Sequence, residues 1–133
     1  MKLDAPFDSD LLAALGAEAI QLLCNGDINT LASRFGYALS YGREPVSAIK
    51  EDLRQSLSEV GASTLAVAAE RDLPNVKYFE PNSSFLVAVV ECHVPTDSGA
   101  MLLVELVVTT REVEKYITLE QISSVGAVNI LDR

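Results

Sequence analysis

The sequence predicts an α+β protein in which three N-terminal helices pack on a curved, mainly antiparallel sheet. Apolar residues recur at helical spacing in the first half of the chain. Three apolar runs at 85–94, 100–110 and 116–123 then follow one another with short turns between them, which is typical of antiparallel strands. Both faces of these runs are apolar, so we expect helices on one side of the sheet and a partner or a ligand cavity on the other.

The size and charge of the chain narrow the class of protein. Its 133 residues fit a single domain, 1–133, that is large enough to bury a core without disulfides. Acidic residues outnumber basic ones by 19 to 10, which leaves a formal net charge of −9. This acidic balance argues against nucleic acids and anionic membranes as partners, and it favours a basic protein or a neutral small molecule.

Cysteine usage and hydropathy bear on the expected location. Cys24 and Cys92 each stand alone in a predicted helix or strand, so we expect reduced core thiols. Residues 1–6 lack the apolar run of a signal peptide, and no later segment is long enough to cross a bilayer. We therefore expect a cytoplasmic protein with no membrane partner and no cofactor.

Each helix is predicted from its end signals and an apolar stripe. Asp8 can cap the first helix, and Asn25-Gly26 ends it. Asp27 can cap a short second helix, and Pro45 takes the favoured first position of a third. The three stripes are Leu11, Leu12, Leu15, Ala19, Leu22 and Leu23, then Ile28, Leu31 and Phe35, then Val46, Ile49, Leu53, Leu57 and Val60. The opposite face of the third helix is interpreted as solvent-exposed: Lys50, Glu51, Asp52, Arg54 and Glu59.

Three shorter segments are expected to join the sheet. Tyr37, Leu39 and Tyr41 alternate with small residues, which predicts a short strand. Residues 63–72 fit a helix or a strand, and the need of the sheet for partners favours a strand. The segment Val76–Phe79 is expected to extend the sheet.

The long strands carry the candidate site residues. A turn at 95–99 sets Glu91 opposite Glu105 and places His93 on the same face. A similar count at the next turn brings Glu120 beside Glu105. This face also carries Phe85, Val87, Val89, Leu103, Val107 and Tyr116. The other face is uniformly apolar: Leu86, Ala88, Val90, Cys92, Leu102, Val104, Leu106 and Val108.

Two interpretations of this cluster stay open. If the face lines a cavity, repulsion between carboxylates raises at least one pKa, and Glu91 or His93 becomes a candidate general acid or base. If the face meets solvent or a dimer partner, the same residues are surface groups. A metal site built from Glu91, His93 and Glu105 has suitable ligand types, but one histidine at this spacing is no recognised motif, and we expect no metal.

The order of elements resembles the nuclear-transport-factor-2-like superfamily, the cone-shaped α+β fold shared with ketosteroid isomerases and polyketide cyclases. Asn25-Gly26-Asp27 before Leu31 and Phe35 is similar to the family's Gly-Asp turn into its second helix. Gly42-Arg43-Glu44 before Val46 and Ile49 resembles the family's entry to its third helix. The resemblance covers most of the chain. It implies a conical cavity between sheet and helices, and homodimerisation through the outer face of the sheet.

Three functions are compatible with these observations. The first is a non-catalytic dimeric module that binds a small amphipathic ligand in the cavity, where the resemblance places Tyr37 and Tyr41. The second is an acidic protein-interaction module with a basic partner, similar to the toxin-neutralising immunity proteins of this superfamily. The third is an isomerase-, cyclase- or dehydratase-type enzyme that moves a proton with Glu91, His93 or a cavity tyrosine. The candidate ligand-binding residues are Tyr37, Tyr41, Glu91, His93, Glu105 and Glu120.

Overall fold

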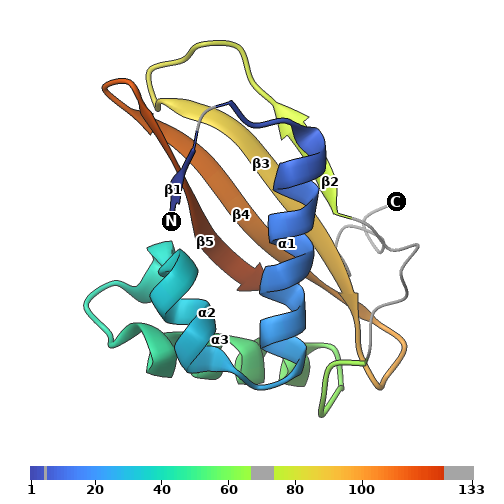
Figure 1. Ribbon diagram of the computed structural model, residues 1–133. Coiled ribbons are helices and arrows are strands. Elements are labelled where there is room, and N and C mark those ends of the chain that lie inside the picture. Colours follow the sequence, from blue (N-terminus) through green and yellow to red (C-terminus); the bar gives the residue numbers. More distant parts are fainter. Residues whose placement is uncertain (5, 67–73, 125–133) are drawn as a thin grey trace.

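The computed structural model describes residues 1–4, 6–66 and 74–124, and it confirms the predicted α+β class (Figure 1). The helices are α1 (Ser9–Cys24), α2 (Ile28–Phe35) and α3 (Pro45–Glu59). The strands are β1 (Lys2–Leu3), β2 (Asn75–Tyr78), β3 (Leu86–Pro95), β4 (Met101–Arg111) and β5 (Glu114–Ser123). They form one five-stranded antiparallel sheet in the order β1-β5-β4-β3-β2.

The three helices pack on one face of the sheet and form the core with it. Figure 1 shows α1 crossing this face, with α2 and α3 near the end of β5. Alternate residues of the long strands point into this layer, so their apolar side chains lose their contact with water. The largest fully buried side chains are Leu12, Leu31, Phe35, Ile49, Val90, Val94, Leu102, Val104, Leu106, Val108, Ile117 and Leu119.

Most of the predicted end signals are present. The Asp8 carboxylate accepts a hydrogen bond from the Leu11 backbone N–H at 2.9 Å and caps α1. Asp27 stands at the start of α2, but its carboxylate accepts from the Thr30 hydroxyl and makes no hydrogen bond to the helix backbone. Pro45 is the first residue of α3, as predicted.

The strand predicted at residues 37–41 is wrong. Tyr37 makes a single parallel bridge to Leu119, and the chain then turns through a short 3-10 helix, Ala38–Ser40. Two local features favour this turn. Tyr41 adopts a left-handed conformation with φ 47°. The Arg43 guanidinium donates hydrogen bonds to two backbone carbonyls of the turn. In a strand, such carbonyls would accept hydrogen bonds from a neighbouring strand instead.

The segment predicted at 63–72 is described only up to residue 66. Leu65 forms an isolated antiparallel bridge to Thr96, and residues 67–72 lie outside the described ranges. The predicted extension of the sheet at Val76–Phe79 is confirmed as strand β2.

Two β-bulges alter the strict alternation that the sequence predicted. One lies between Leu86 and Ala88, so Leu86 is opposite Thr109, and Val87 packs against the core. The prediction that Val87 shares the face of Glu91 is therefore wrong. The prediction that Leu86 lies on the opposite face with Ala88 is wrong as well, because its partner Thr109 alternates with the core residue Val108. The second bulge, between Glu105 and Leu106, belongs to the candidate site.

Both cysteines are free, with Cys92 buried and Cys24 half-buried. Burial raises the pKa of Cys92 to about 12 and also raises that of Cys24. None of the helices in the described ranges is long and apolar enough to span a membrane.

Candidate functional site

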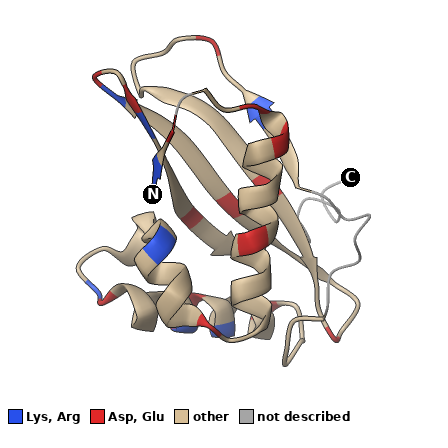
Figure 2. Cartoon of the chain, viewed as in Figure 1, with Lys and Arg blue, Asp and Glu red and all other residues tan. Residues whose placement is uncertain are grey.

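The predicted register of the first hairpin is confirmed, and it brings acidic residues from neighbouring strands together. Glu91 on β3 lies opposite Glu105 on β4, and His93 lies opposite Leu103. Figure 2 shows acidic segments in the middle of β3, β4 and β5. The second hairpin is shifted by one residue, so that Gln121 lies opposite Glu105. Glu91, Glu105 and Glu120 form the group that we call the acidic row.

The bulge in β5 determines where Glu120 lies. Leu119 and Ile122 are core residues, and the two residues between them, Glu120 and Gln121, are both half-buried. A bulge places two residues opposite one residue of the next strand, here Glu105. The Gln121 side-chain amide donates a hydrogen bond to the Glu105 carboxylate. The acidic row therefore ends in an amide and a carboxylate side by side.

The acidic row lies on the face of the sheet that points away from the helices. Its neighbours in sequence, Val90, Cys92 and Val104, point into the core and are almost fully buried. Side chains alternate across a strand, so Glu91 and Glu105 point the opposite way, and His93 is exposed. The row does not converge on the space between the sheet and the helices.

One member of the row is partly neutralised by strand β2. The Lys77 ammonium lies 3.1 Å from Oε1 of Glu91, and the Asn75 side-chain amide donates to the same oxygen at 3.3 Å. The Lys77 side chain is 56% exposed, so water weakens this ion pair. In the described part of the chain, no group of three or more His, Cys, Asp or Glu side chains is arranged to hold a metal ion.

Aliphatic side chains surround the row on the same face. Val89 and Val107 lie opposite each other, two residues along the strands from Glu91 and Glu105, and both are half-buried. Leu103, opposite His93, is only 8% exposed. The open face therefore combines apolar area with carboxylates, a composition that can serve as a binding surface.

The two candidate tyrosines lie in different environments. Tyr37 is 6% exposed, and its hydroxyl donates to Oδ2 of Asp52 at 2.6 Å. Tyr41 is 80% exposed and points away from the core. The Tyr37 backbone bridges to Leu119, next to Glu120, but its side chain belongs to the core. The six predicted site residues are thus divided between the open face of the sheet and the 37–43 turn.

The partner of Tyr37 was missed by the sequence interpretation. Asp52 was assigned to the solvated face of α3, but its side chain is only 21% exposed and is held by Arg43 through two hydrogen bonds, at 2.9 and 3.1 Å. The Arg43 hydrogen bonds, followed by that of Tyr37, hold the pKa of Asp52 below its usual range. Burial, and then the Asp52 carboxylate, raise the pKa of Tyr37. These groups fasten the 37–43 turn to α3, which is a structural role.

Within residues 1–4, 6–66 and 74–124, two clefts beside α3 are open to solvent. The smaller, about 280 Å³, lies between α3 and the end of β5 and is lined by Asp52, Gln55, Ser56, Glu59, Ile122, Ser123 and Ser124. The larger, about 630 Å³, lies along Lys50, Leu53, Arg54, Leu57, Ser58, Gly61, Ala62 and Ser63. Neither contains a residue of the acidic row. Comparisons of the chain with protein-family models, with curated proteins and with solved structures found no match.

Proposed function

We propose that this chain is a protein-interaction module of the nuclear-transport-factor-2-like kind that binds a basic protein through the open face of its sheet. The observation that supports the proposal is the acidic row, which crosses three neighbouring strands among aliphatic side chains on the face without helices. The order of three helices and five antiparallel strands is compatible with the superfamily.

Each component of the open face has a physical role in this proposal. Burial of the half-buried Val89 and Val107 against a partner contributes affinity through the hydrophobic effect. The carboxylates of Glu91 and Glu105 attract Lys and Arg side chains and reject acidic partners. The net charge of −9 adds a long-range attraction for basic proteins, which speeds their association at low salt.

Side-chain packing favours a surface function over a cavity function. Large side chains such as Phe35, Leu31 and Leu119 fill the layer between helices and sheet with almost no exposure. Glu91 and His93, the candidate acid–base groups, point away from this layer. A small ligand or a reaction between the layers therefore has less support than a partner on the open face.

The test neutralises the acidic row without changing its size. Glu91, Glu105 and Glu120 are replaced together by Gln, and a matched control replaces three glutamates of the helical side, Glu18, Glu51 and Glu59. Both triple variants carry the same net charge, so they separate local recognition from overall attraction. Val107 is replaced by a photo-crosslinking amino acid in all three proteins, and crosslinks are mapped in the native host cell.

We expect the unmodified row and the helical-side control to crosslink to the same basic protein. The purified complex should weaken as ionic strength rises, and the row variant should bind at least about tenfold more weakly. Equal crosslinking by the row variant would refute the proposal. Crosslinking of Val107 to a second copy of this chain, with a dimer in sedimentation equilibrium, would replace it with homodimerisation through the same face.

A further inference from the structure

Exposed apolar side chains gather at one end of the molecule, away from the acidic row. The large exposed apolar residues there are Leu11 (40% exposed), Tyr78 (51%), Phe79 (45%), Phe85 (63%) and Val113 (88%). They come from the start of α1, the end of β2, the β2–β3 loop and the β4–β5 turn, which all lie at the top of Figure 1. We call these five residues the apolar end.

Hydrogen bonds connect the segments that carry the apolar end. The Ser9 hydroxyl at the start of α1 donates to the Tyr78 hydroxyl at 3.3 Å. The Phe79 N–H donates to the carbonyl of Val87 at 3.0 Å, two residues from Phe85. The Phe85 carbonyl in turn accepts from the Thr110 N–H at 3.0 Å, close to the β4–β5 turn. These hydrogen bonds hold the start of α1, the end of β2, the β2–β3 loop and the end of β4 in fixed positions relative to one another.

The loop that presents Phe85 is held in one conformation by Asn82. The Asn82 amide donates to the carbonyls of Glu80 and Leu86, both at 2.9 Å. Its side-chain oxygen accepts from the N–H groups of Ser84 at 3.0 Å and Leu86 at 3.2 Å. These four hydrogen bonds reduce the entropy that the loop loses when a partner binds.

Phe85 itself occupies an unfavourable backbone conformation. Its φ is 57°, in the left-handed region that a bulky side chain rarely adopts. Its side chain is mostly exposed, so packing in the free protein does not explain a phenylalanine at this position. A strained, rigid and exposed aromatic residue is typical of a binding site.

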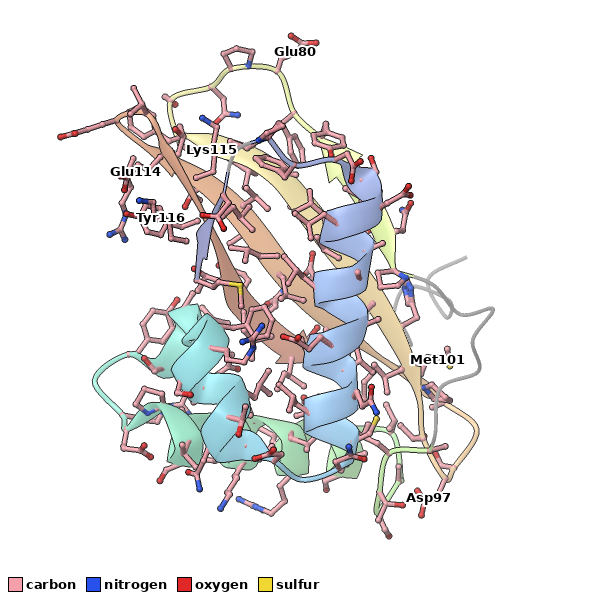
Figure 3. All side chains as sticks on the ribbon, in the orientation of Figure 1. Glu80, Asp97, Met101, Glu114, Lys115 and Tyr116 are labelled. Carbon is pink, nitrogen blue, oxygen red and sulfur yellow. The ribbon has the colours of Figure 1, made fainter. Side chains whose placement is uncertain are left out.

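Acidic side chains surround the apolar end. Asp10 at the start of α1, Glu80 in the β2–β3 loop and Glu112 in the β4–β5 turn are exposed, and within the described ranges none of them forms an ion pair. Figure 2 shows acidic segments in these three places, and Figure 3 shows Glu80 pointing outward from the top of the loop. Figure 2 also shows basic segments beside the β4–β5 turn, where Arg111 and Lys115 flank it, so the charge around the apolar end is mixed. Asp10, Glu80 and Glu112 are the carboxylates that the basic groups of a partner could meet there.

We propose that the apolar end binds a segment of a partner protein in which an aromatic or aliphatic side chain is flanked by Lys or Arg. The apolar side chain packs on Phe85 and Phe79, and the basic side chains pair with Glu80 and Glu112. This site is separate from the acidic row and does not depend on the function proposed for the open face.

The test is a selection of random short peptides on the intact protein by phage display. The selected peptides are then synthesised, and their affinity is measured by the fluorescence of a Phe79→Trp variant. The chain contains no other tryptophan, so the signal comes from the apolar end alone. We expect selected peptides to contain an apolar residue next to Lys or Arg, and their binding to weaken as ionic strength rises.

Two variants and a control distinguish binding at the apolar end from non-specific binding to exposed aromatic side chains. Phe85→Ala should weaken binding about tenfold or more, and Asn82→Ala, which leaves Phe85 in place but frees the loop, should weaken it less. The control is Tyr41→Ala, which removes an even more exposed aromatic side chain elsewhere and should leave binding unchanged.

Three results would overturn the proposal. These are a selection without enriched peptides, equal losses for Phe85→Ala and Tyr41→Ala, and a fluorescence change with neutral phosphatidylcholine vesicles instead of peptides. The last result would assign the apolar end to a membrane surface. Circular dichroism of Phe85→Ala checks the fold, which the removal of an exposed side chain should preserve.

Discussion

Gly16 sets the distance between helix α1 and strand β3, so Gly16→Ala is a direct test of the core. Gly16 is buried in the middle of α1. A Cβ atom added there would lie 2.8 Å from Cγ1 of Val90, 3.1 Å from Cγ of Pro74 and 3.3 Å from Sγ of Cys92. The first contact is well inside van der Waals distance, so the Val90 side chain, the helix or the strand has to shift.

Two opposing effects determine the size of the change. Alanine favours a helix over glycine by about 1 kcal/mol, which stabilises the variant. Overpacking of a filled core costs about 1–3 kcal/mol, and three crowded contacts, one with the fully buried Val90, place this site in the upper half of that range. We therefore expect a net destabilisation of about 1–2 kcal/mol, or a fall in Tm of about 4–8 °C for a chain of this size.

The assay is urea denaturation followed by circular dichroism, with the free energy of unfolding compared at constant m-value. Ala17→Gly, at an exposed position of the same helix, measures the propensity difference without crowding. Val90→Ala should destabilise the protein by itself, but it should relieve the clash that Gly16→Ala creates. The double variant should therefore lose at least about 1 kcal/mol less unfolding free energy than the two single variants lose in total. Stabilisation by Gly16→Ala, or additive effects with Val90→Ala, would refute the close approach of α1 to β3.

Three further predictions concern groups outside this contact. Asp52→Asn should destabilise the protein by about 1–2 kcal/mol at neutral pH, because the Arg43 guanidinium loses the carboxylate with which it is paired. The pKa of Asp52 is lowered in the folded state. The difference in unfolding free energy between the two proteins should therefore reach its full size above the unfolded-state pKa of about 3.9, and it should disappear as the pH falls through the folded-state pKa. Urea titrations at several pH values measure this difference. With Ellman's reagent near pH 8, Cys24 should react faster than Cys92, and Cys92 should react only when the protein unfolds, because it is more deeply buried. Equally rapid reaction of both thiols would contradict the packing. Asp8→Ala should lower the free energy of unfolding by about 1 kcal/mol, whereas Asp8→Ser, which keeps a capping oxygen, should lower it much less. Similar changes in Tm for the two variants would argue against the cap.

Local patterns in the sequence were sufficient for most of the fold. Apolar residues at helical spacing and their end signals predicted α1, α2 and α3, because an amphipathic helix needs one buried face whatever its partner is. The turn at 95–99 predicted that Glu91 lies opposite Glu105, since a short turn restricts the register of its two strands. The shared face of these two carboxylates followed from the same count.

Other features depended on contacts between residues far apart in sequence. The bulges at Val87 and Glu120 insert one residue each, and no local pattern distinguishes a bulged strand from a regular one. The segment at 37–41 alternates like a strand, but Arg43 and Asp52 hold it in a turn. Hydrophobic periodicity could not predict this turn. It indicates which side chains are buried, but it does not indicate which backbone carbonyls accept a hydrogen bond from a side chain such as Arg43.

The sequence by itself determined the fold class, the three helices, the long strands and the pairing of the first hairpin. Only the tertiary structure decided that the acidic row faces away from the helices, because the sequence pattern left open whether this face lines a cavity or meets solvent until the helices covered the other face. It also brought Leu11, Phe79, Phe85 and Val113 to one end of the molecule. Such surfaces arise from segments that are distant in sequence, so folding has to assemble them before they can bind a partner.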